Sequence, residues 1–112
     1  MSKYFSEKYK DLIGDTGAVV ELKDFDRSKI RQLVDYLASL KPGITVAIVN
    51  DIDNKLQILV KNLNASKDAS QILKGVFEIS EGRGGGKKDF AQGGTNDNTK
   101  LKEVVEYLKT QI

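Results

Sequence analysis

The sequence predicts a small α/β domain in which a mixed β-sheet, built from a βαβ unit and an antiparallel hairpin, is flanked by helices. The chain has 112 residues, enough for one hydrophobic core and too few for two. Two observations predict the fold class. A segment with apolar residues at helical spacing lies between two strand-like segments, 18–25 and 44–49. A third strand-like segment, 56–60, follows after a short run of turn-forming residues.

The first 17 residues are expected to form a helix and a turn. Apolar side chains between Phe5 and Ile13 fall at helical spacing, and the glycines at 14 and 17 bound a turn. From Ala18 onward alternate residues are apolar, which is typical of a half-buried strand. We therefore divide the chain into an N-terminal helix and turn, 1–17, and a single globular domain, 18–112.

The clearest helix is predicted over residues 30–40. Its apolar stripe consists of Ile30, Leu33, Val34, Leu37 and Leu40. Asp26 is expected to cap its N-terminus, and the run Lys41-Pro42-Gly43 ends it.

Residues 44–49 are nearly all apolar or β-branched, which predicts a central strand covered on both faces. Alternating apolar residues at 56–60 predict the next strand, so the run from Asn50 to Asn54 is expected to join two antiparallel strands. Asp51 and Asp53 in this run could alternatively form a catalytic or metal-binding pair. The hairpin turn is favoured, because an oxygen-ligand calcium loop needs more acidic residues at regular spacing.

Two further helices follow. Asp68 and Gln71 have the spacing of a capping box before an apolar helical pattern. Gly75 lies inside this helix, where it costs about 1 kcal/mol relative to alanine, so it is expected to mark a close approach of another element. Asp97 is expected to cap the last helix, whose apolar positions recur up to Leu108.

The most informative segment is 82–94, which we call the glycine segment. It holds six of the ten glycines in the chain. It also carries Arg83, Lys87 and Lys88 against Asp89, a net charge of +2 that equals the charge of the whole chain. A glycine run lets backbone N–H groups converge on an anion. We therefore predict a surface loop between two helices that faces an anionic ligand.

Three alternatives for the glycine segment are disfavoured. A dinucleotide-binding fingerprint would need glycine at position 87, and a P-loop would need glycine at 81; these positions hold Lys87 and Glu81. A flexible linker would not need Asp89-Phe90-Ala91-Gln92, which can pair with a sheet edge or pack a ring.

Histidine and cysteine are both absent, which removes the usual general base, the common nucleophilic triads and the usual zinc ligands. We expect no catalytic residue and no metal site in this chain. No stretch approaches the roughly 20 apolar residues that span a bilayer, so no membrane partner is expected. The absence of cysteine leaves nothing that points to an oxidising compartment, so a cytoplasmic location is expected.

The segment from Asp68 to Lys74, the glycine segment from Arg83 to Gly94, and Asp97 with the closing helix together resemble the C-terminal domain of alanyl-tRNA synthetases, in the DHH-associated domain family. In that family the segment runs Gly-Gly-Gly-Arg/Lys-x-Asp-Met-Ala-Gln-Ala-Gly-Gly. This chain departs from it in having Phe90 in place of methionine and in lacking one alanine after Gln92. The resemblance covers residues 18–112 and implies a fold like that of the family.

The resemblance implies a non-catalytic domain that binds the elbow of tRNA(Ala) and helps coordinate aminoacylation and editing. The parent enzyme would use ATP, magnesium and zinc in its other domains. Those other domains would be further partners of this domain. Residues 1–17 would be a remnant of the connection to upstream domains. The RNA-binding residues would be Arg83, Gly84, Gly85, Gly86, Lys87, Lys88, Gln92, Gly93 and Gly94.

Two other functions stay open. The chain could be an oligomerisation module of the same enzyme, since the family offers precedent for a homodimer and the first helix has an apolar stripe. It could also be the substrate-binding accessory domain of a DHH-family phosphoesterase. Such phosphoesterases often have histidine after the triple glycine, where this chain has Lys87, and this difference favours the synthetase.

Overall fold

The computed structural model describes residues 14–112. The helix expected within the first 13 residues therefore lies outside the described part of the chain. The elements in chain order are β1 (Gly17–Lys23), α2 (Ile30–Ala38), β2 (Thr45–Ile52), β3 (Lys55–Asn62), α3 (Ala69–Ile79), β4 (Gly82–Gly86), β5 (Phe90–Thr95) and α4 (Leu101–Gln111).

The strands form one five-stranded sheet in the order β1-β2-β3-β5-β4. β1 and β2 are parallel and are joined through α2, whereas the other three pairings are antiparallel. The predicted mixed sheet with a βαβ unit and an antiparallel hairpin is confirmed. β2 lies inside the sheet, and its residues from Thr45 to Asn50 are all buried, as the apolar run predicts.

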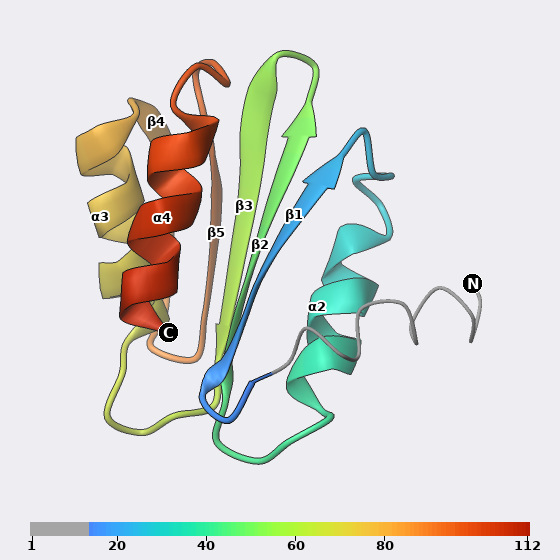
Figure 1. Ribbon diagram of the computed structural model, residues 1–112, viewed down its shortest axis with the longest axis vertical. Helices are drawn as coiled ribbons and strands as arrows, with labels where there is room; N and C mark the ends of the chain where they lie inside the picture. Colours follow the sequence, from blue (N-terminus) through green and yellow to red (C-terminus); the bar gives the residue numbers. More distant parts are fainter. Residues whose placement is uncertain (1–13) are drawn as a thin grey trace.

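Helices cover the two faces of the sheet unequally. Figure 1 shows α3 and α4 on one face and α2 on the other. The α3/α4 face holds a core of buried side chains from β2, β3, β5 and both helices. The α2 face holds a second core over β1, β2 and part of β3. Within residues 14–112 no helix has the length and apolarity needed to cross a membrane.

A tight turn joins β2 to β3, and the predicted hairpin is confirmed. Asp53 and Asn54 have φ values of 56° and 62°, the left-handed conformation that both central residues of a type I′ turn require. The Asp51 carboxylate accepts a hydrogen bond from the Asn98 amide at 2.9 Å. The Asp53 carboxylate pairs with Arg27 at 3.0 Å. Both carboxylates therefore have structural partners.

Two predicted helix caps are wrong. Asp26 accepts hydrogen bonds from the backbone and hydroxyl of Ser28, and α2 begins only at Ile30. Asp97 makes the same pair of bonds with Thr99, and α4 begins at Leu101. In both places the aspartate stabilises its own short turn before the helix, a local alternative that aspartate side chains readily provide.

The cap at Asp68 is confirmed. Its carboxylate accepts from the backbone N–H groups of Ser70 and Gln71 and from the Ser70 hydroxyl. The hydrogen bond from that hydroxyl is the main cause that holds the pKa of Asp68 below its ordinary value. The start of α3 is therefore stabilised by an ionised cap.

The glycine segment is a β-hairpin, so the prediction of a loop is wrong. β5 pairs with β3 from Lys61↔Phe90 to Gln57↔Gly94, and β4 then pairs with β5 as the last strand of the sheet. Glycine disfavours strands when considered locally. Pairing with β3 supplies the missing stabilisation, which no local pattern in the segment reveals.

Asn62, at the end of β3, joins four parts of the chain. Its side-chain oxygen accepts from the Thr45 hydroxyl at 2.7 Å and from the Asn64 N–H at 3.0 Å. Its amide nitrogen donates to the carbonyls of Asn64, Lys67 and Lys88 at 3.1, 2.8 and 3.0 Å. The residue is 3% exposed. One buried amide thus ties β2 and the β3–α3 connection to the turn of the glycine hairpin.

Gly75 lies where α3 packs on α4. A Cβ at this position would overlap the phenol ring of Tyr107. That phenol donates a hydrogen bond to the Ile72 carbonyl at 3.1 Å. The predicted close approach at Gly75 is confirmed, and its partner is Tyr107.

We predict that Gly75→Ala lowers the free energy of unfolding by about 1 to 3 kcal/mol, the usual cost of overpacking, despite the better helix propensity of alanine. In a Tyr107→Ala background the same substitution should instead stabilise by up to about 1 kcal/mol. Urea unfolding of the four proteins of this double-mutant cycle checks the sign change. An equal effect in both backgrounds would contradict the contact.

We predict that Asn62→Asp destabilises the domain by about 3 kcal/mol or more at pH 7, because it places an unpaired negative charge against three carbonyl groups. Burial favours the protonated acid, so the loss should shrink as the pH falls towards about 3.9, the ordinary pKa of aspartate. Unfolding curves of the variant and the parent at pH 4 and pH 7 measure the difference. A loss that is the same at both pH values would argue against the three-carbonyl arrangement.

Candidate nucleic-acid interface

The structure brings the nine predicted site residues together on one hairpin. Arg83 to Gly86 belong to β4, Lys87 and Lys88 to the turn, and Gln92 to Gly94 to β5. The register pairs Arg83 with Gly94 and Gly85 with Gln92. Residues opposite one another in an antiparallel pair share a face, so these four lie on the same side of the sheet.

This side is the α2 face, beyond the part of the sheet that α2 covers. The part of the sheet that α2 covers ends at Phe90 of β5, where the Arg31 guanidinium of α2 lies 3.9 Å from the centre of the ring. Past this point β3, β5 and β4 present polar or glycine residues that are exposed or half-buried. We call this surface the open face and define it as Lys55, Gln57, Arg83, Gly85, Gln92 and Gly94.

Four glycines of the hairpin, Gly82, Gly84, Gly86 and Gly93, lie where a side chain would collide with its surroundings. A Cβ at Gly84 would lie 2.5 Å from the Gln92 carbonyl oxygen and 2.5 Å from the Gly93 Cα, and one at Gly93 would lie 2.9 Å from the Phe77 ring. Gly82 and Gly86 would likewise collide with the β5 backbone. These glycines allow the two strands to approach closely beneath α3, so the packing of the hairpin requires them.

Gly85 is the exception. A Cβ at this position would meet nothing within 4 Å. The residue is exposed, and a side chain would point onto the open face. A glycine in a strand costs roughly 0.5 to 1 kcal/mol relative to alanine. Since no internal contact within residues 14–112 needs this glycine, the space above it is available for the close approach of a ligand.

The backbone of β4 adds hydrogen-bonding groups. β4 stands at the end of the sheet and, within the described part of the chain, pairs only with β5. An edge strand presents a row of unpaired N–H and C=O groups. Its residues from Arg83 to Gly86 are all exposed, so these groups can meet a polar ligand directly.

Lys87 and Lys88 lie away from the open face, in the turn between β4 and β5. The Lys87 N–H donates to the Phe90 carbonyl at 2.7 Å, and the Lys88 carbonyl accepts from the Ala69 N–H at 2.8 Å. The backbone of the turn is therefore held firmly while both side chains remain exposed. The Lys88 charge makes a minor contribution to the lowered pKa of Asp68.

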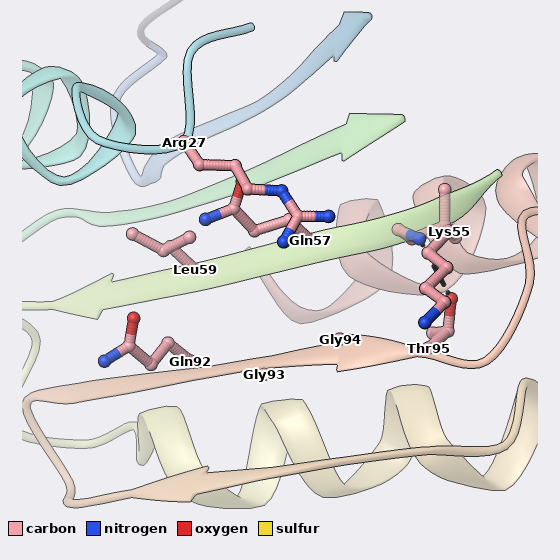
Figure 2. Close-up of a pocket in the computed structure, with 9 residues that line it drawn as sticks. Arg27, Lys55, Gln57, Leu59, Gln92, Gly93, Gly94 and Thr95 are labelled. Atoms are coloured by element: carbon pink, nitrogen blue, oxygen red, sulfur yellow. Dashed lines mark hydrogen bonds between the residues drawn. The ribbon is translucent and has the colours of Figure 1, made fainter. Parts of the chain in front are cut away.

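A hollow in the open face contains residues that sequence reasoning missed. Its volume is about 300 Å³, and its lining includes Arg27, Lys55, Gln57, Leu59, Gln92 and Gly94. Figure 2 shows Arg27 reaching over it from the connection between β1 and α2, with Lys55 on β3 and Gln92 on β5. The alternation of β3 could have placed Lys55 and Gln57 on one face. No local signal marks Arg27, which arrives there through the fold.

The groups around the hollow are hydrogen-bond donors and cations. Arginine, lysine and amide donors surround the hollow, and its lining contains no carboxylate. Among residues 14–112 no group of three or more acidic side chains could hold a metal ion. The surface can bind an anion through charge and hydrogen bonds, as contacts to a phosphate backbone require.

Comparison with known proteins identifies a domain family and longer proteins that contain a similar segment. The family model described as "DHHA1 domain" matches residues 14–112. The alanine-tRNA ligase of Acholeplasma laidlawii is 35% identical over 83 residues, which are 74% of this chain and 9% of the ligase. That of Aliarcobacter butzleri is 28% identical in an alignment of length 115 that covers 99% of this chain and 13% of the ligase. The chain thus spans about a tenth of the length of these relatives.

Solved structures share the fold. The C-Ala domain of Aquifex aeolicus alanyl-tRNA synthetase matches with a TM-score of 0.73 and 24% identity, covering 88% of this chain and 92% of that domain. RecJ from Thermus thermophilus, in complex with Mg²⁺, matches with a TM-score of 0.68 and 15% identity, covering 96% of this chain and 17% of RecJ. The match of the family model along residues 14–112 and the shared fold show that this chain belongs to the DHHA1 domain family.

Proposed function

We propose that this chain is the C-terminal domain of an alanine-tRNA ligase and that it binds the elbow of tRNA(Ala) without chemistry of its own. The observation that carries the proposal is the glycine hairpin, whose open face combines Arg83, Gln92 and an unobstructed Gly85. In the parent enzyme this binding would help aminoacylation and editing act on the same tRNA.

The residues fit RNA recognition for physical reasons. Arg83 is exposed and can grip a phosphate with two parallel hydrogen bonds. The side-chain amide of Gln92 can bond to a base edge or a 2′-hydroxyl group. The glycine at 85 lets the sugar–phosphate chain approach the sheet. Lys87 and Lys88 at the turn add charge beside this surface.

The similarity to alanine-tRNA ligases supports the choice of tRNA. Two ligases match 74% and 99% of this chain, which spans only 9% and 13% of their length. ATP, magnesium and zinc would be used in other domains of the parent enzyme, which would also be partners of this one. A translation enzyme of this kind would work in the cytoplasm.

One other function has a specific observation in its favour. The fold matches RecJ over 96% of this chain, as expected for the substrate-binding accessory domain of a phosphoesterase. Short oligonucleotides bound as tightly as tRNA would favour this function. The homodimer stays a prediction, because the apolar stripe that suggested it lies within residues 1–13, and sedimentation over a range of concentrations would test it.

We predict that replacing Arg83, Lys87 and Lys88 together with glutamate weakens the binding of tRNA(Ala) and flattens its dependence on salt. Each lost phosphate contact should reduce the slope of log affinity against log salt by about 0.7 to 0.9. Fluorescence anisotropy titrations measure the affinity and its salt slope. The salt concentration is varied from about 50 to about 300 mM, the range over which such contacts weaken.

The control for this experiment is Lys102→Glu on α4, which changes charge on the opposite face of the sheet. A tRNA with a disrupted elbow should bind the parent domain more weakly than intact tRNA(Ala). Unchanged affinity of the triple variant would contradict this placement of the site, and equal binding of the two tRNAs would contradict recognition of the elbow.

We predict that the glycines of β4 separate into two classes. Gly84→Ala should lower the midpoint of thermal unfolding, because its Cβ would lie 2.5 Å from the β5 backbone. Gly85→Ala should leave stability unchanged or raise it by about 0.5 to 1 kcal/mol.

For tRNA binding by folded variants, we expect a substitution at Gly85 to matter more than one at Gly84. Gly85→Val places a branched side chain above the open face and should weaken tRNA binding while the domain stays folded. Thermal melts combined with anisotropy titrations test both statements. A Gly85→Val protein that binds tRNA like the parent would show that this glycine leaves no space that the ligand uses.

A further inference from the structure

We propose that Arg27, Lys55 and Gln57 form a second subsite on the open face that binds the sugar–phosphate backbone of the same tRNA. This inference rests on the proposed function and extends the contact surface beyond the glycine segment. The three residues come from the β1–α2 connection and from β3, and they line the hollow that borders Gln92 and Gly94 of the hairpin.

The register of the sheet links this subsite to the hairpin. Gln57 pairs with Gly94, and Gly94 pairs with Arg83, so one row crosses β3, β5 and β4. Neighbouring strands lie about 4.8 Å apart, which separates the Cα atoms of Gln57 and Arg83 by about 10 Å. The residue between these two donors has no side chain. A polar chain lying across the sheet can therefore reach both.

Gln57 is held in an orientation suited to donating. Its side-chain oxygen accepts a hydrogen bond from the Asn50 amide at 3.2 Å. Asn50 is itself fully buried and bonded to both backbone groups of Phe25. Within residues 14–112 the Gln57 side-chain nitrogen donates to no protein group, so this nitrogen is the atom available to a phosphate or ribose oxygen.

Lys55 provides an uncompensated positive charge. Its side chain makes no ion pair within the described range, 14–112, and it borders a hollow without carboxylates. A cation over such a surface attracts a phosphate and releases counterions when it binds. The contact is therefore expected to contribute to the salt dependence of binding.

Arg27 already has an anionic partner that RNA would share or displace. Its Nη2 atom lies 3.0 Å from Asp53 Oδ2, with 53% and 72% of the two side chains exposed. An exposed ion pair of this kind contributes only about 0 to 1 kcal/mol. The guanidinium also has five N–H donors, so a phosphate can bind the groups that Asp53 leaves open. Asp53 thus orients Arg27 and at the same time lowers the local positive charge.

The test uses the full chain, tRNA(Ala) and anisotropy titrations over a range of salt concentrations. Arg27→Ala and Lys55→Ala should each weaken binding and reduce the salt slope by about 0.7 to 1. Asp53→Asn should strengthen binding, because it removes a negative charge beside Arg27. Asparagine tolerates the positive φ of this turn position, so this variant keeps the hairpin. In an Arg27→Ala background the gain from Asp53→Asn should shrink.

Matched controls lie on α4, on the other face of the sheet. Lys102→Ala removes one positive charge and Glu103→Gln removes one negative charge, and both should leave binding nearly unchanged. If Arg27→Ala and Lys55→Ala bind like the parent while Arg83→Ala weakens binding, the subsite is wrong and the proposed function stands. If the parent chain binds no tRNA, the proposed function itself fails.

Discussion

The position of the candidate site depends on the hydrogen bonds of the Asn62 side chain. The glycine hairpin has few side chains of its own to pack, so its place must be set by its neighbours. Asn62 donates to the Lys88 carbonyl in the turn of the hairpin, and its backbone N–H donates to the Asp89 carbonyl at 2.8 Å. The same side chain accepts from Thr45 on β2. A buried amide whose oxygen and nitrogen are both hydrogen-bonded holds its partners rigidly. Asn62 therefore holds one end of the hairpin against the centre of the sheet.

The glycines of the hairpin differ in what surrounds them. Gly84 and Gly93 face α3, where any side chain would strike the neighbouring strand or Phe77. Gly85 faces away from the helices and has free space. The surroundings differ because the alternation of a strand directs successive residues to opposite faces. No helix in the described part of the chain covers the other face of the hairpin, so its residues there are exposed or half-buried.

The character of the open face suits recognition that depends on geometry more than on charge. The chain carries a net charge of only +2, so a strong non-specific attraction to nucleic acid is not expected. A few cations, oriented amides and an accessible strand edge offer contacts to a ligand of defined shape. Under the proposed function, binding of moderate strength would be sufficient, since attachment to a larger enzyme would raise the effective concentration of the tRNA at the other domains.

The sequence alone determined the order and type of most elements, because hydrophobic periodicity is a local consequence of which face each residue buries. It also located the close approach at Gly75 and the hairpin at Asp53, where a single conformation requires particular residues. The predicted helix caps at Asp26 and Asp97 were wrong, since an aspartate can stabilise either a helix or its own turn. Only the tertiary structure decided that the glycine segment is two strands and that Arg27 and Lys55 share a surface with it. Those facts depend on pairing and packing between residues far apart in the chain, and such long-range contacts leave no periodic trace in the sequence.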